Sequence, residues 1–201
     1  MCVIAIKQPG KTIENLNWFS KAINNNPDGS GLFYKGEIFK SLDKTETLSK
    51  VKEISKDKDF KKELFVFHSR LKTHGSCRTD NCHPFTKGRY ICFHNGVMRL
   101  PSVLDKTDSE LWFKYLWYPA YTARDTEGIL VALQIVQDSR VLIIDKFKNE
   151  IILQTGEWVE HNGLSLSNKN TLYEFKYKYS TDRWIEDKWM EYDITRYKKK
   201  N

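Results

Sequence analysis

The sequence of 201 residues predicts a single α+β domain. Several segments carry apolar residues at helical spacing, whereas others are short apolar runs that are rich in β-branched and aromatic residues and bounded by turn residues. The two kinds of segment are interspersed without the regular strand–helix alternation of a doubly wound sheet. No internal repeat and no linker divides the chain, and its length suits one domain. We therefore expect one mixed, layered domain over residues 1–201.

The N-terminal half begins with a predicted buried strand at residues 3–8. A helix is expected over residues 12–25, because Leu16, Phe19 and Ile23 share one of its faces and the following "NNNPDGSG" favours turns. The other elements predicted here are a hairpin at 32–39 that turns at Lys35-Gly36, a lysine-rich surface helix at 42–62, and strands at 63–69 and 89–94.

In the C-terminal half, Thr107 to Glu110 have the form of a capping box, so a helix is predicted to begin there and continue to residue 118. A second helix is expected over residues 125–137, with Leu130 among its inward-facing residues. Strands are predicted at 140–145, 150–160 and 163–168. From about residue 175 a C-terminal extension carries tryptophans at helical spacing, and the sequence assigns it no role.

The net charge of +7 is spread along the chain, and its densest cluster is the terminal "RYKKKN". We interpret that cluster as a solvated tail, and we expect no nucleic-acid partner because no recognition motif accompanies the charge. No run approaches the roughly 18–20 apolar residues of a membrane span. Lys7 to Gly10 interrupt the first apolar run too early for a secretory signal. We therefore expect a cytoplasmic protein that does not contact a membrane.

Four cysteines occur in this chain, at positions 2, 77, 82 and 92. Without an export signal, reduced thiols, a metal site or catalysis are better interpretations than disulfides. One alternative is a zinc site that combines Cys77, Cys82, Cys92 and His94, although the spacing is not the tight Cys-x-x-Cys type. A cysteine at position 2 is by default a small buried apolar residue.

Five short polar stretches are unusual for a core, and each alone has an ordinary explanation as a turn, a cap or a surface charge. They are "MC" at 1–2, "NPDGSG" at 26–31, "HSRLKTHG" at 68–75, "HNG" at 94–96 and "TDSE" at 107–110. Together and in this order they resemble the glutaminase domain of class II glutamine amidotransferases, the N-terminal-nucleophile type. The resemblance extends over roughly residues 2–168. Within it, residues 139–168, with a Gly-Glu-Trp turn and a Ser-Asn end, look like the second sheet of stand-alone members.

The resemblance implies a four-layer αββα sandwich and hydrolysis of L-glutamine to glutamate and ammonia, without metal or other cofactor. In this family Cys2 becomes the first residue once Met1 is removed, and its thiol forms a thioester with the substrate. The freed α-amine has a reference pKa of about 7.7–8.0, which suits a general base at neutral pH. The other cysteines are then expected to be core or loop thiols rather than zinc ligands.

The remaining site residues also follow from the resemblance. Asn95 and Gly96 match the pair that donates to the oxyanion of the tetrahedral intermediate. Arg70 matches the arginine that binds the substrate α-carboxylate, for which a guanidinium is suited. Asp108 matches the carboxylate that binds the α-ammonium group. Residues Thr73 and His74 match positions that line the same pocket and orient the substrate.

One departure from the family pattern is Leu71-Lys72, where relatives often have Trp-Ala between the arginine and the threonine. This difference motivates a second hypothesis, an amidase acting on another γ-glutamyl-like amide. A third hypothesis is a non-catalytic binding module that retains the fold. For the leading hypothesis, we expect a separate synthetase or transferase subunit to accept the ammonia, because no such domain follows in this chain.

Overall fold

The computed structural model describes residues 2–72, 76–98, 100 and 105–172. Within them lie two antiparallel sheets flanked by helices, so the prediction of a mixed α+β class is confirmed. The predicted C-terminal extension from about residue 175 lies outside the described residues. Among the described residues, no helix has the length and apolar character needed to cross a membrane.

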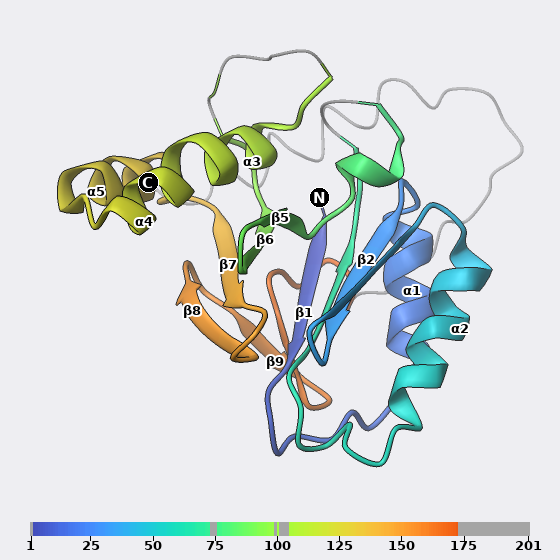
Figure 1. The fold of residues 1–201 in the computed structure, drawn as a ribbon. Coiled ribbons are helices and arrows are strands. Elements are labelled where there is room, and N and C mark those ends of the chain that lie inside the picture. The colour runs from blue at the N-terminus through green and yellow to red at the C-terminus, as the bar shows by residue number, and fades with distance from the viewer. Residues whose placement is uncertain (1, 73–75, 99, 101–104, 173–201) are drawn as a thin grey trace, which may run out of the picture.

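The first sheet has six strands in the order β3-β2-β4-β1-β10-β9, and the second has four in the order β5-β6-β7-β8 (Figure 1). The strands of the first sheet are β1 (Val3–Lys7), β2 (Ser30–Tyr34), β3 (Glu37–Ser41), β4 (Phe65–Ser69), β9 (Val159–His161) and β10 (Leu164–Leu166). Those of the second are β5 (Phe85–Lys87), β6 (Tyr90–Asn95), β7 (Arg140–Asp145) and β8 (Glu150–Gln154).

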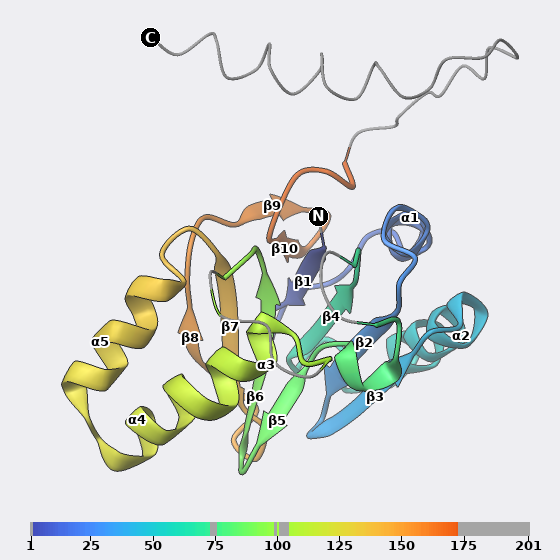
Figure 2. The ribbon, with the colours of Figure 1, turned by 90° about the horizontal axis from the view of Figure 1, so that it is seen from above.

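The helices lie on either side of the strands, as Figure 2 shows from above. On one side are α1 (Asn17–Asn25) and α2 (Lys44–Ser55); on the other are α3 (Asp108–Leu111), a π-helical segment (Trp112–Trp117), α4 (Tyr118–Ala123) and α5 (Thr126–Ile135). The predicted cap at Thr107 is confirmed, because its hydroxyl accepts from the Glu110 N–H. Asp125 caps α5 in the same way by accepting from the Gly128 N–H.

Alternation along the strands divides the apolar residues into three clusters. In β1, Val3 and Ala5 pack with residues of α1 and α2, whereas Ile4 and Ile6 point to the opposite face. That opposite face joins Phe93 and other residues of the second sheet in one cluster. The third cluster packs the other face of the second sheet against the aromatic residues of the π-helical segment and against Ala132 of α5. Burial on both faces explains why β1 is almost wholly apolar.

Several predicted boundaries require correction. The first helix begins at Asn17 rather than near residue 12. The predicted strand 150–160 is divided into β8 and β9, because the chain turns at Gly156 with a φ of +73°. Leu130 of α5 was expected to face inward but is 57% exposed, so α5 buries Ala132 instead. The hairpin turn at Lys35-Gly36 is confirmed, with positive φ at both residues as a type I′ turn requires.

Burial predicts a large effect on stability for one Leu→Ala substitution and a small effect for another. Leu142 is 0% exposed in the cluster shared by the two sheets, so Leu142→Ala should lower the free energy of unfolding by about 2–5 kcal/mol. Leu130→Ala removes an exposed side chain and should change it by less than about 0.5 kcal/mol. Urea denaturation of both variants checks this, and a large loss at Leu130 would contradict the assigned orientation of α5.

Candidate active site

Segments that are far apart in the sequence line one small cavity of about 30 Å³. Four predicted site residues contribute to it: Cys2, Arg70, Gly96 and Asp108. The other lining residues are Leu71, His83, His94, Thr107 and Ser109. Asn95 directly precedes Gly96 and is buried, but it does not line the cavity. Thr73 and His74 lie outside the described residues.

The pairing of β1 with β4 places Cys2 beside Arg70. The two strands are antiparallel with Val3 opposite Ser69, so Cys2, which precedes β1, and Arg70, which follows β4, lie at the same end of the sheet. The thiol of Cys2 donates to the carbonyl oxygen of Leu71 at 3.4 Å and accepts from the Leu71 N–H at 3.3 Å. The sheet therefore fixes the thiol against the segment that carries the arginine.

Burial raises the pKa of the Cys2 thiol above its ordinary value. The hydrogen bond from the Leu71 N–H and the positive charge of Arg70 act in the opposite direction but do not outweigh burial. At neutral pH the resting sulfur is therefore a protonated thiol. Nucleophilic attack by this residue needs a base that removes its proton.

The turn at residues 26–31 supports the Arg70 segment. The Arg70 N–H donates to the carbonyl oxygen of Gly29 at 2.8 Å, and its carbonyl oxygen accepts from the Asp28 N–H at 3.0 Å. The Asp28 carboxylate also accepts from the N–H of Lys72 at 2.7 Å. Gly29 has a φ of +113°, and a Cβ there would lie 2.4 Å from the sulfur of Cys82, so only glycine fits. The arginine side chain itself is buried and donates from Nη1 to the Ser76 carbonyl oxygen at 3.1 Å.

Asn95 and Gly96 lie at the end of β6 in the second sheet, and Gly96 lines the cavity. The side-chain amide of Asn95 donates from Nδ2 to the hydroxyl of Ser167 at 2.9 Å. Gly96 has a φ of +156°, and a Cβ there would lie 2.3 Å from Oγ of Ser139. A side chain at position 96 would therefore force the β6 terminus away from the cavity.

Asp108 is the first residue of α3, and its carboxylate is held by three donors. Oδ2 accepts from the Met98 N–H at 2.7 Å, and Oδ1 accepts from the backbone N–H and the hydroxyl of Ser109 at 2.8 and 3.2 Å. Two carboxylate oxygens offer about four acceptor directions, so one remains for a bound cationic group. Arg70 and Asp108 thus present opposite charges to one cavity.

Three buried histidines, His68, His83 and His94, form a group beside this cavity that was not predicted from the sequence. The ring centroids of His68 and His83 are 4.3 Å apart, and those of His83 and His94 are 6.4 Å apart. Nδ1 of His94 forms a hydrogen bond of 2.7 Å with Oγ of Ser109. The other five ring nitrogens of the three histidines form no hydrogen bond with the described residues. The available signal was their positions in "FHS", "CHPF" and "FHNG", each beside a buried strand.

Burial lowers the pKa of all three histidines, because a protonated imidazole loses its hydration there. The pKa of His68 falls to about 3 and that of His94 to about 4, and the pKa of His83 lies well below its ordinary value. All three rings are therefore neutral at pH 7. Within the described part of the chain, no three or more His, Cys, Asp or Glu side chains are arranged to hold a metal ion, so the zinc alternative gains no support.

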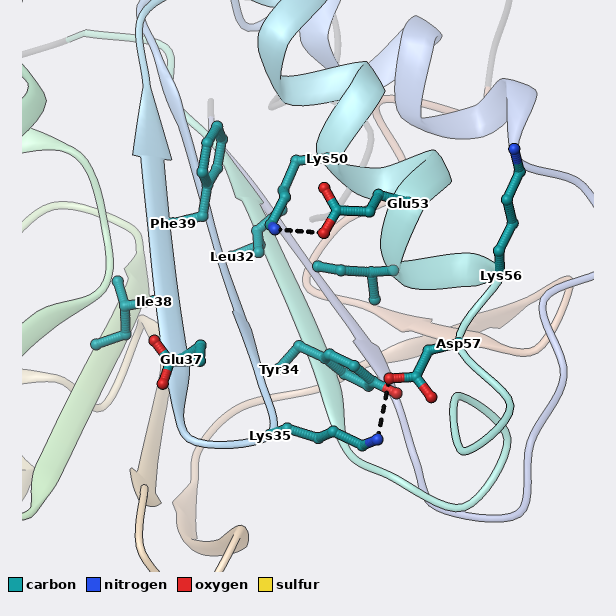
Figure 3. Close-up of a pocket in the computed structure, with 11 residues that line it drawn as sticks. Leu32, Tyr34, Lys35, Glu37, Ile38, Phe39, Lys50, Glu53, Lys56 and Asp57 are labelled. Atoms are coloured by element: carbon teal, nitrogen blue, oxygen red, sulfur yellow. Dashed lines mark hydrogen bonds and ion pairs between the residues drawn. The ribbon is translucent and has the colours of Figure 1, made fainter.

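A much larger cavity lies elsewhere, between α2 and the β2–β3 hairpin (Figure 3). Its volume is about 680 Å³, and its walls carry apolar side chains and ion pairs such as Lys50–Glu53 at 2.7 Å and Lys35–Asp57 at 2.9 Å. None of the predicted site residues that the structure describes lines it. Size alone therefore does not identify the chemically equipped cavity in this protein.

The buried histidines predict a loss of stability in mild acid. Their folded-state pKa values lie below the unfolded value of about 6.5, so the unfolded chain binds more protons as the pH falls from 6.5 toward 4 and 3. The contribution of the neutral histidines to the free energy of unfolding should be fully present above pH 6.5. Below pH 6.5 the free energy of unfolding should decrease by up to about 1.4 kcal/mol per pH unit for each histidine. Urea denaturation between pH 7 and pH 5 measures this slope.

The control for this prediction is His68→Phe, which keeps a buried ring but cannot bind a proton. Its stability should depend less steeply on pH between 6.5 and 5 than that of the natural protein. An identical slope in the two proteins would mean that His68 is not a neutral buried group in the folded state.

Comparison with known proteins gives the family context of this cavity. The family described as "Glutamine amidotransferases class-II" matches residues 14–131, which is more than half of the chain. The match includes the segments that carry Arg70, Asn95, Gly96 and Asp108, whereas Cys2 precedes it. No curated protein matches the sequence. The matched segment establishes that the chain belongs to the class II glutamine amidotransferases.

Proposed function

We propose that this protein hydrolyses L-glutamine to glutamate and ammonia through a thioester on Cys2. The observation that carries the proposal is the shared cavity, in which a thiol, a guanidinium, a glycine at a strand end and a carboxylate meet from separate segments. Such a set supplies a nucleophile, an oxyanion donor and two groups that bind an amino acid. We propose a single N-terminal-nucleophile domain, and the three apolar clusters support its αββα layering.

The first half of the reaction forms the thioester. After removal of Met1, the α-amine of Cys2 takes the proton of the thiol, and the sulfur attacks the side-chain carbonyl carbon of glutamine. The side-chain amide of Asn95 and the N–H of Gly96 donate to the resulting oxyanion. The ammonium form of the α-amine then protonates the leaving nitrogen, the carbon–nitrogen bond breaks, and ammonia departs.

The second half releases glutamate. The neutral α-amine removes a proton from water, the hydroxide attacks the thioester carbon, and the same donors hold the second oxyanion. Collapse breaks the carbon–sulfur bond, and the thiolate regains its proton from the amine. Neutral pH favours this cycle because the reference pKa of an α-amine is about 7.7–8.0, whereas burial keeps the Cys2 thiol protonated until the base acts.

Substrate selection in this proposal depends on two fixed charges. Arg70 binds the α-carboxylate, Asp108 binds the α-ammonium group, and Thr73 and His74 orient the bound molecule. The cavity of about 30 Å³ has room for about one water molecule and is too small for glutamine in this structure. The ammonia is proposed to pass to a separate synthetase or transferase.

A second candidate function is cleavage of a larger γ-glutamyl amide. Leu71 lines the cavity at a position where the family often has tryptophan, which leaves a different wall beside the thiol. Comparing kcat/KM for glutamine with that for γ-glutamyl amides of increasing size separates the two. A clear preference for glutamine would exclude this candidate.

Covalent labelling tests the nucleophile directly. Treatment with 6-diazo-5-oxo-L-norleucine should add one adduct, located on Cys2 of a chain that lacks Met1, and Cys2→Ala should abolish both labelling and glutamine hydrolysis. Intact-mass and peptide mass spectrometry measure the adduct. Cys77→Ser is the matched control, because Cys77 is the exposed thiol among the described residues and its loss should change neither result. Retained hydrolysis in Cys2→Ala would contradict the mechanism.

Replacing the arginine tests the assignment of the carboxylate site. Arg70→Lys keeps the charge but loses the paired N–H donors, so KM for glutamine should rise by about 10- to 100-fold while kcat changes less. Steady-state kinetics of ammonia release provide the measurement. Lys72→Met is the control, since it removes a neighbouring positive charge that has no assigned role, and an equal rise in KM there would point to general electrostatics instead.

A further inference from the structure

We propose that Ser167 is a positioning residue that orients the Asn95 amide toward the nucleophile at the start of β1. This inference rests on the proposed function, because it concerns the group that would stabilise the oxyanion. Ser167 and Asn168 follow β10 directly, and β10 pairs with β1 in the first sheet (Figure 2). Asn95 ends β6 in the second sheet.

One hydroxyl links the two sheets at this point. Oγ of Ser167 accepts from the backbone N–H of Ile4 at 2.8 Å and from Nδ2 of Asn95 at 2.9 Å. The backbone N–H of Ser167 also donates to the carbonyl oxygen of Ile4 at 2.9 Å. Ser167 is only 1% exposed, so water cannot readily replace these bonds. Because Ile4 is two residues beyond Cys2, the hydroxyl ties the Asn95 amide to the strand that carries the thiol.

The geometry of an amide group explains what this bond controls. The terminal torsion of asparagine has a broad energy profile, so the side chain needs a partner to fix the plane of its amide. Nδ2 carries two N–H groups, and a hydroxyl oxygen has two acceptor lone pairs. When one N–H of Asn95 is directed to Ser167, planarity fixes the direction of the other N–H. That second N–H is the donor assigned to the oxyanion.

The next residue holds the nucleophile in the same way. Nδ2 of Asn168 donates to the carbonyl oxygen of Cys2 at 2.6 Å. Two consecutive residues after β10 therefore hold two groups of the proposed site. Ser167 holds the amide of Asn95, and Asn168 holds the backbone of Cys2. Catalytic groups need this kind of support, because a displacement of about 1 Å can reduce the rate by about 100-fold.

The test compares two serine substitutions on the same segment. Ser167→Ala removes the shared acceptor, whereas Ser165→Ala removes a hydroxyl on the same face of the strand that is 8% exposed and bonds to no described residue. For Ser167→Ala, kcat for glutamine should fall by about 100-fold while KM stays near the natural value. Ser165→Ala should retain kcat. Ser167→Thr keeps the hydroxyl acceptor and should recover much of the lost rate.

Two further measurements separate positioning from general damage to the fold. Alkylation of Cys2 by iodoacetamide, followed at its own peptide by mass spectrometry, develops no oxyanion and should proceed at the natural rate in Ser167→Ala. Proton exchange at the Asn95 side-chain amide, followed by NMR, should accelerate in Ser167→Ala and remain slow in Ser165→Ala.

The outcomes distinguish this inference from the proposed function. A natural protein that does not turn over glutamine contradicts the proposed function and the catalytic part of this inference, while the amide exchange still decides whether Ser167 fixes Asn95. Normal turnover in Ser167→Ala overturns the inference and leaves the proposed function intact. Unchanged exchange at the Asn95 amide overturns it as well.

Discussion

The antiparallel pairing of β1 with β4 is the interaction on which the candidate site depends. It places Val3 opposite Ser69, so the strand register itself brings Cys2 and Arg70 together at one end of the sheet. A shift of one residue in this register would also reverse which face of β1 carries each apolar side chain. Both faces of β1 are buried in separate clusters, and the register that builds the core is therefore the register that builds the site.

The second sheet and the helix beyond it complete the lining of the cavity. The strand end of this sheet places Gly96 in the cavity that Cys2 lines, and α3 adds Asp108 to the same cavity. This junction buries several polar groups, among them Arg70, Asn95 and Ser167, and each buried polar group without a partner costs about 1–3 kcal/mol. The hydroxyl of Ser167 satisfies two donors at once, whereas the neighbouring histidines stay neutral because they are buried. The site is thus maintained by precise pairing around it and by the apolar clusters on either side.

Much of this arrangement could be predicted from the sequence, since its signals are local. Period-two and period-3.6 patterns located most strands and helices. The order of short polar motifs singled out Cys2, Arg70, Gly96 and Asp108, which line one cavity in the fold. Features that depend on tertiary contacts were not predictable: β5 has only three residues, and the exposure of Leu130 is decided by how α5 packs. The grouping of His68, His83 and His94 follows from three strand ends that meet in space, which no spacing in the sequence records. The role of Ser167 was hidden for the same reason, because its partners are 72 and 163 residues away.

The central claim is that the thiol of Cys2 becomes covalently bonded to the substrate. The most direct measurement is mass spectrometry of protein quenched in acid during steady-state turnover of isotopically labelled glutamine. We expect an N-terminal peptide that begins at Cys2 and carries a labelled γ-glutamyl group in thioester linkage, and this group should disappear when glutamine is exhausted. A chain that releases labelled ammonia while Cys2 remains unmodified, or while Met1 still precedes it, would contradict the account.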